Sequence, residues 1–155
     1  MKLAEVVPWG RTLREYRLMF NLSQADLEKS ILGCGDGPAS FNVEMMELGH
    51  SVISVDPIYQ FSAEQIRQRV QETYKSVISQ VKQNLQCYVW RDFKDADELG
   101  QARLAVAERF LLDYEVGKIE GRYQCQSLPN LKLADAQFGL GLCSHLLFLY
   151  SEQLS

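Results

Sequence analysis

Three glycines lie close together in the first quarter of the chain and suggest a loop that holds a ligand. Gly33, Gly35 and Gly37 follow the apolar run 30–32 and precede Pro38. Because glycine has no side chain, the backbone can turn sharply there and let a ligand lie against its amides. The NAD fingerprint needs a glycine at position 38, and no Gly-Lys-Ser/Thr follows, so neither an NAD loop nor a Walker loop fits.

An acidic residue at a matching distance favours a nucleoside site. Asp56 ends the next apolar run, 51–55, and Pro57 after it prevents further strand pairing. A carboxylate placed about 20 residues beyond such a loop can accept hydrogen bonds from both hydroxyls of a ribose. The alternative is a plain glycine turn, with Asp56 as a helix cap or an exposed strand end.

The flanking pattern predicts the elements that position the loop. We expect a buried strand at 30–32, a helix from Pro38 that ends at Gly49, and a second strand at 51–55. A strand-helix-strand unit of this kind is almost always right-handed and makes its strands parallel neighbours. Capping boxes and apolar spacing predict the other elements: helices over 13–20, 62–85 and 95–117, a short turn from Ser23, and strands over 123–126 and 138–143.

Three segments carry a resemblance to a known family. Ile31–Gly37 resembles motif I of the class I S-adenosylmethionine-dependent methyltransferases, and Val52–Asp56 resembles their second motif. Phe138–His145 is similar to the strand that this family places beside the methyl-transfer site. The resemblance implies an α/β, Rossmann-like parallel sheet with strand order 3-2-1-4 and helices on both faces.

The resemblance also implies how the chain is organised. Residues 1–155 form a single S-adenosylmethionine-binding domain, and 61–117 is a helical insertion where the family commonly has one helix. The insertion would form a lid or substrate wall, or else supply extra packing or a dimer surface. A fifth strand and a terminal hairpin normally follow the fourth strand, so we expect an incomplete domain whose open sheet edge favours a homodimer.

The same resemblance assigns roles to particular residues. The expected cofactor is S-adenosylmethionine, and the cofactor-binding residues are Gly33, Cys34, Gly35, Gly37, Asp56, Pro57, Ser127, Leu128 and Ser144. His145 is the candidate catalytic base, because an ordinary imidazole pKa of about 6.5 suits proton transfer near neutrality. A capping or packing role is the alternative for His145.

Departures from the family pattern leave two functions open. Ile31 stands where the family usually has an acidic residue, and Gly139 stands where it usually has an aspartate. One function is methyl transfer from the sulfonium to an oxygen, nitrogen or carbon nucleophile of a small molecule. The other is a nucleoside-binding or assembly module without catalysis. Pro38 disfavours a third, an NAD-dependent oxidoreductase.

Composition limits the partners. The net charge of -4 offers no overall positive field for a phosphate backbone, so nucleic acid is not expected. No apolar stretch approaches the roughly 20 residues that span a bilayer. The four cysteines show no metal-binding spacing and are expected to be reduced thiols of a cytoplasmic protein.

Overall fold

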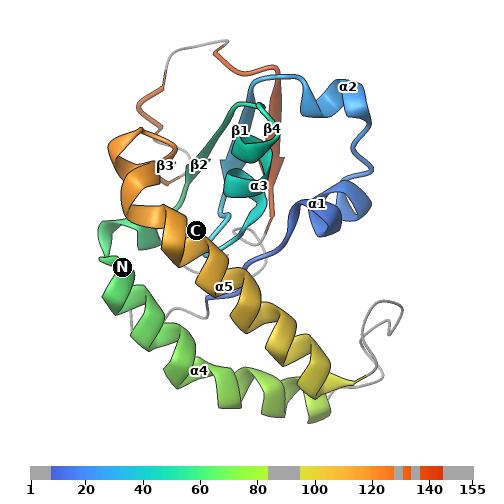
Figure 1. Ribbon diagram of the computed structural model, residues 1–155, viewed down its shortest axis with the longest axis vertical. Helices are drawn as coiled ribbons and strands as arrows, with labels where there is room; N and C mark the ends of the chain where they lie inside the picture. The colour runs from blue at the N-terminus through green and yellow to red at the C-terminus, as the bar shows by residue number, and fades with distance from the viewer. Residues whose placement is uncertain (1–7, 84–94, 128–130, 134–136, 145–155) are drawn as a thin grey trace.

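The computed structural model describes residues 8–83, 95–127, 131–133 and 137–144 (Figure 1). Its helices are α1 (Leu13–Met19), α2 (Gln24–Leu27), α3 (Phe41–Glu47), the 3-10 helix η2 (Pro57–Gln60), α4 (Ala63–Gln83) and α5 (Ala96–Ile119). Its strands are β1 (Ile31–Cys34), β2 (Val52–Val55), β3 (Tyr123–Gln124) and β4 (Leu140–Cys143). Within the described part of the chain, no helix has the length and hydropathy that crossing a membrane requires.

The four strands form one parallel sheet in the order β3-β2-β1-β4. The predicted α/β, Rossmann-like architecture with strand order 3-2-1-4 is therefore confirmed. The chain moves outward from β1 through β2 to β3 and then returns to the other side of β1 for β4. In open parallel sheets a ligand binds beyond the carboxyl ends of the strands at such a reversal of strand order. The carboxyl end of β1 is thus the expected position of a ligand.

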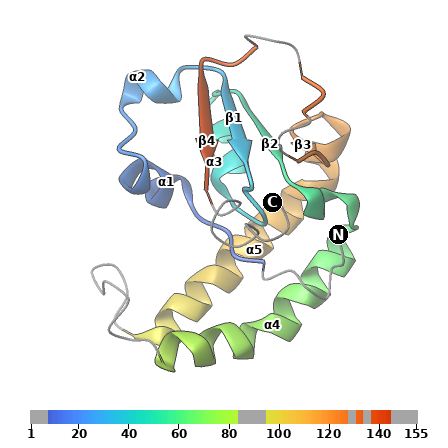
Figure 2. The same ribbon diagram turned by 180° about the vertical axis from the view of Figure 1, so that it is seen from behind.

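One core lies between the sheet and the helices α1 and α3. Ile31, Val52 and Leu142 come from three different strands and belong to one buried cluster. Tyr16 of α1 and Phe41 of α3 also belong to it, and their stacked rings lie 4.3 Å apart between centroids. Seen from behind, the strands lie in front of α3 (Figure 2). Helices on the opposite face of the sheet stay a prediction.

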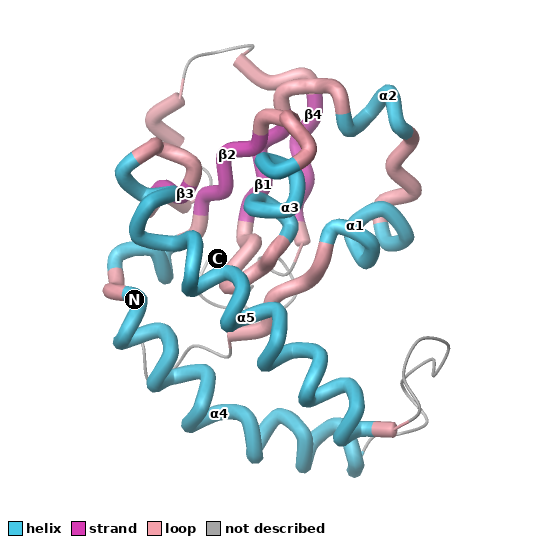
Figure 3. The backbone as a smooth tube through the Cα atoms, viewed as in Figure 1, coloured by secondary structure: helices cyan, strands magenta, loops and turns pink. Residues whose placement is uncertain are grey.

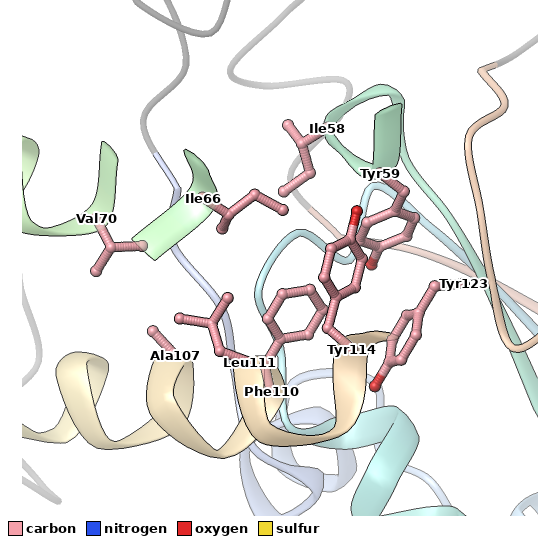
Figure 4. Close-up of a cluster of buried hydrophobic side chains, with 9 residues drawn as sticks. All are labelled: Ile58, Tyr59, Ile66, Val70, Ala107, Phe110, Leu111, Tyr114 and Tyr123. Atoms are coloured by element: carbon pink, nitrogen blue, oxygen red, sulfur yellow. The ribbon is translucent and has the colours of Figure 1, made fainter. Parts of the chain in front are cut away.

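A second core joins the long helices α4 and α5 to the sheet. The two helices lie side by side and run in opposite directions (Figure 3). Ile66 and Val70 of α4 contribute to a buried cluster with residues of η2, α5 and β3, drawn in Figure 4. Four aromatic rings dominate that cluster, namely Tyr59, Phe110, Tyr114 and Tyr123. Tyr59 thus packs in the core and links the segment after β2 to α5.

Helix α5 continues past the glycine at which the sequence predicted its end. The helix includes Gly117 and stops at Ile119, and Gly121, with a φ of 82°, lies in the turn that follows. A Cβ at Gly117 would lie 2.4 Å from Cε2 of Tyr123. Gly117 is therefore needed for the close approach of the Tyr123 ring, and the left-handed glycine that ends the helix lies four residues further on.

The elements around the loop also begin and end at other residues than expected. Strand β1 includes Gly33 and Cys34, whereas the prediction ended it at Leu32. Helix α3 begins at Phe41, and Pro38 belongs to the preceding loop. Gly35 and Gly37 have positive φ values, which an α-helix does not accommodate, so the chain is still in the loop at Gly37. Strands β3 and β4 are shorter than predicted, at two and four residues.

Candidate functional site

The glycine loop leaves the carboxyl end of β1 and is tied to the end of β2. Gly35 has a φ of 73° and Gly37 a φ of 58°, a backbone conformation that other L-residues rarely adopt. The amide of Gly35 donates to the carbonyl of Val55 at 2.9 Å. The loop therefore turns directly above the β1–β2 pair, at the sheet edge where the reversal of strand order predicts a ligand.

Asp56 connects the loop to the segment after β2. Its Oδ2 accepts a hydrogen bond from the amide of Gly37 at 2.9 Å, and its Oδ1 accepts one from the amide of Ile58, also at 2.9 Å. The second bond caps η2, so the helix-cap interpretation of Asp56 is correct. The first bond places the carboxylate against the glycine loop as well, which a helix cap does not require.

Burial changes the acidity of Asp56. The side chain is only 4% exposed, and the loss of hydration raises its pKa to about 6, although the two amide hydrogen bonds oppose the shift. The charge of nearby Asp36 adds to the increase. At neutral pH Asp56 is still ionised. Each carboxylate oxygen has two lone pairs and uses one of them here, so both oxygens keep an acceptor position.

Asp36 is a member of the site that the sequence analysis did not single out. Its carboxylate accepts from the hydroxyl of Tyr16 at 2.7 Å and from that of Ser54 at 2.5 Å. It is 2% exposed, and burial raises its pKa to about 6. An acidic residue between two loop glycines was the available signal. Its side chain points into the protein, and its hydrogen bonds to Tyr16 and Ser54 attach the loop to α1 and β2.

Ser144, an expected cofactor-binding residue that directly follows β4, lies against the loop. Its amide donates to the carbonyl of Cys34 at 3.2 Å, and its hydroxyl donates to the carbonyl of Gly35 at 2.8 Å. The Tyr16 hydroxyl approaches the Ser144 oxygen at 3.4 Å. Three segments, from α1, β1 and β4, thus meet at the loop.

The other expected cofactor-binding residues differ in their position and in their exposure to solvent. Cys34 is buried at the end of β1, and Pro57 opens η2, where its carbonyl accepts from the Cys125 thiol at 3.6 Å. Ser127 is exposed beyond β3. Leu128 and His145 lie outside the described residues, so their expected roles stay predictions.

A segment far from the loop in sequence passes over it. Residues 9–11, here called the N-terminal strap, run so close that a Cβ on Gly10 would lie 2.1 Å from the Pro38 carbonyl oxygen. Arg103 of α5 donates to the Gly10 carbonyl at 2.6 Å, forms an ion pair with Glu15, and lies 5.3 Å from the Trp9 ring centroid. The inserted helix therefore holds the strap on the loop.

Comparisons with known proteins show the family of the chain. No family model matches it, and no solved structure matches it. The uncharacterized protein MJ0045 of Methanocaldococcus jannaschii is 30% identical over 159 residues, which cover 100% of this chain and 70% of MJ0045. The chain belongs to the MJ0045 family. Because the similarity extends along the whole chain, MJ0045 offers a second protein in which the site can be tested.

Proposed function

We propose that this member of the MJ0045 family binds S-adenosylmethionine at the glycine loop and transfers its methyl group to an oxygen, nitrogen or carbon nucleophile of a small molecule. The observation that carries the proposal is the hydrogen bond between the Gly37 amide and Asp56 Oδ2. It brings a glycine turn at the end of β1 and a carboxylate at the end of β2 to one point of the sheet edge. A nucleoside site needs those two parts together.

The residues fit the adenosine half of this cofactor. Both oxygens of Asp56 can each accept one more hydrogen bond, which matches the two hydroxyls of a ribose. At Gly37 the nearest atoms to an added Cβ are the Trp9 carbonyl oxygen at 3.8 Å and Asp56 Oδ2 at 4.0 Å, so a ligand can approach the backbone there. Because Asp56 is almost fully buried and the strap adjoins Gly37, the strap must shift when a ligand enters.

The chain contributes mainly by holding two molecules in line. The chemistry that the cofactor supplies when bound is an electrophilic methyl group on a sulfonium. Asp56 and the loop would orient the nucleoside, and the strap and α5 would exclude water. His145 follows Ser144 directly and is the proposed base for the attacking group. The net charge of -4 favours a small-molecule substrate over a nucleic acid.

A second function is favoured by one specific observation. Ile31 belongs to the core cluster against α1 and α3 and is fully buried, so it offers no group to the amino-acid end of the cofactor. Asp36 is bound to Tyr16 and Ser54 inside the protein and does not replace it. A site that recognises only the nucleoside would serve a binding or assembly module without catalysis.

Calorimetric titration with four ligands distinguishes these functions. We expect S-adenosylmethionine and S-adenosylhomocysteine to bind, adenosine to bind more weakly, and NAD not to bind. Equal affinities for adenosine and S-adenosylhomocysteine, without methyl transfer to any fraction of a small-molecule extract, would favour the module without catalysis. If none of the nucleosides binds to the folded protein, both functions are wrong.

A further inference from the structure

Two cysteines face each other across neighbouring strands at the base of the glycine loop. Cys34 ends β1, Cys143 ends β4, and the two are register partners in the parallel pair. Register partners of adjacent parallel strands direct their side chains to the same face of the sheet. Strands are spaced about 4.7–4.9 Å apart, within the Cα separation of about 4.4–6.8 Å that a disulfide accepts. The two thiols are near enough that Cys143 contributes to raising the pKa of the Cys34 thiol.

The two sulfur atoms differ in their access to solvent. Cys34 is buried and Cys143 is exposed. Burial and the neighbouring Cys143 together raise the pKa of the Cys34 thiol. Cys34 therefore keeps its proton at neutral pH, and Cys143 is the cysteine that a reagent in solution reaches first. An exposed thiol beside a second, resolving thiol is the arrangement on which reversible disulfide formation depends.

We propose that Cys34 and Cys143 are a site of reversible oxidation, at which hydrogen peroxide or a related peroxide joins β1 to β4 through a disulfide. This proposal does not depend on the proposed function, because it rests on the strand register that pairs the two cysteines and on their difference in exposure. It concerns the two cysteines as a pair, and neither would serve by itself.

The chemistry balances with one peroxide for each disulfide. The Cys143 sulfur attacks one oxygen of hydrogen peroxide, the O–O bond breaks, and a sulfenic acid and one water form. The Cys34 sulfur then attacks the sulfenic sulfur, the S–O bond breaks, and the hydroxyl leaves as a second water with the Cys34 proton. Both thiols are oxidised and the peroxide is reduced. A dithiol reductant reverses the bond by exchange through Cys143.

The crosslink would lie within the framework of the candidate site. The Cys34 carbonyl accepts from the Ser144 amide, and Gly35, the first residue of the loop with positive φ, follows Cys34 directly. A covalent bond between β1 and β4 would keep Ser144 beside the loop. Oxidation would thus restrict the loop.

Peptide mapping can identify the bond without ambiguity. Cleavage after lysine and arginine places the four cysteines on four peptides, 30–67, 83–91, 123–132 and 133–155. After mild peroxide treatment, we expect the intact protein to lose two hydrogen atoms, and alkylation under non-reducing conditions should then modify two of its four cysteines. Peptides 30–67 and 133–155 should be joined, and dithiothreitol should separate them.

A variant that lacks the other two cysteines tests the pair by itself. Cys87→Ser with Cys125→Ser leaves only the proposed cysteines, and it should still form the intramolecular bond. Adding Cys143→Ser should abolish it and leave Cys34 unreacted with peroxide, whereas adding Cys34→Ser should leave Cys143 to oxidise alone. The proposal is overturned if the parent protein joins other peptides, forms only intermolecular bonds, or oxidises Cys143 to sulfinic acid while Cys34 stays a thiol. Folding of each variant is checked by circular dichroism.

Discussion

The carboxylate of Asp36 occupies the space beside Gly33 in which a side chain would lie. An added Cβ at Gly33 would be 2.1 Å from Asp36 Oδ2, a separation that real atoms do not adopt. Gly33 is therefore required by a contact inside the protein. The first glycine of the loop makes room for a buried acid, and that acid in turn is fixed by the hydroxyls of Tyr16 and Ser54.

Gly33→Ala should destabilise the protein by about 1–3 kcal/mol, the usual range for overfilling a packed core. Removing the obstacle with Asp36→Ala should make the same glycine substitution much less costly, and urea denaturation of the four proteins of this double-mutant cycle measures the difference. Gly141→Ala on the neighbouring strand is the matched control, because nothing lies within 4 Å of its Cβ position. If Gly33→Ala lowers the free energy of unfolding equally in the parent and in the Asp36→Ala variant, the steric explanation is wrong.

The free energy of unfolding should depend on pH because of Asp36. Burial raises its pKa from 3.8 to about 6, so the folded state binds its proton more tightly than the unfolded state does. Its contribution to the free energy of unfolding is therefore largest below about pH 4 and is lost as pH rises to about 6. One pKa unit corresponds to about 1.4 kcal/mol, so the loss is up to about 3 kcal/mol.

Asp36→Asn should remove that loss. The unfolding free energy of the variant, minus that of the parent, should increase between about pH 4 and pH 6, the interval of the shift. Asp26→Asn is the opposite control, because hydrogen bonds from Ser23 and Lys29 lower the pKa of that exposed carboxyl and its contribution is lost as pH falls. A difference for Asp36→Asn that does not change with pH would argue against the raised pKa.

Asp56→Ala should weaken binding of S-adenosylhomocysteine by about 10-fold to 150-fold, which corresponds to losing a charge-assisted hydrogen bond of roughly 1.5–3 kcal/mol. Asp97→Ala is the control, because Asp97 is an exposed carboxylate whose ion pair with Lys82 lies on the α4–α5 hairpin. Calorimetry gives the affinities, and thermal melting shows whether Asp56→Ala is folded. Unaltered affinity in a folded Asp56→Ala protein rejects the role in ribose binding.

Arg103→Met should destabilise the protein by about 3–5 kcal/mol, because it leaves Glu15 without its main buried partner and releases the Gly10 carbonyl. Arg67→Met removes the exposed ion pairs to Glu64 and Glu108 and should change the free energy of unfolding by less than about 1 kcal/mol. Chemical denaturation measures both. Similar small effects of the two substitutions would mean that Arg103 does not hold the N-terminal strap.

The free edge of β4 should favour a homodimer. Among the described strands β4 is the outermost on its side of the sheet, and an unpaired edge offers backbone amides and carbonyls to another chain. Light scattering over a range of protein concentrations should show dimers, and the β4 amides should be protected from hydrogen exchange only at the higher concentrations. A monomer at every concentration, with those amides exchanging freely, would refute this association.

Much of the architecture was predictable from patterns that are local in the sequence. The strand order now observed was implied by the resemblance to the methyltransferase family. Apolar runs, capping boxes and turn residues indicated the two parallel strands around the loop and the long helices α4 and α5. Thr12 and Ser23, which directly precede helices α1 and α2, accept the cap hydrogen bonds that were expected at the start of the first helix and of the short turn. These features depend on neighbours within a few residues, and the backbone responds to such neighbours in the same way in most proteins.

The tertiary structure alone decided which groups meet at the site. Arg103 reaches the Gly10 carbonyl across 93 positions of sequence, and Ser144 reaches the Gly35 carbonyl across 109. The ring of Tyr123 explains why helix α5 contains Gly117, and the Asp36 carboxylate explains Gly33. Periodicity describes which face of an element is apolar, but it contains no information on the partner that the face or a glycine will touch. That partner is set by how the elements pack, because close packing leaves only one arrangement in which each of these spaces is filled.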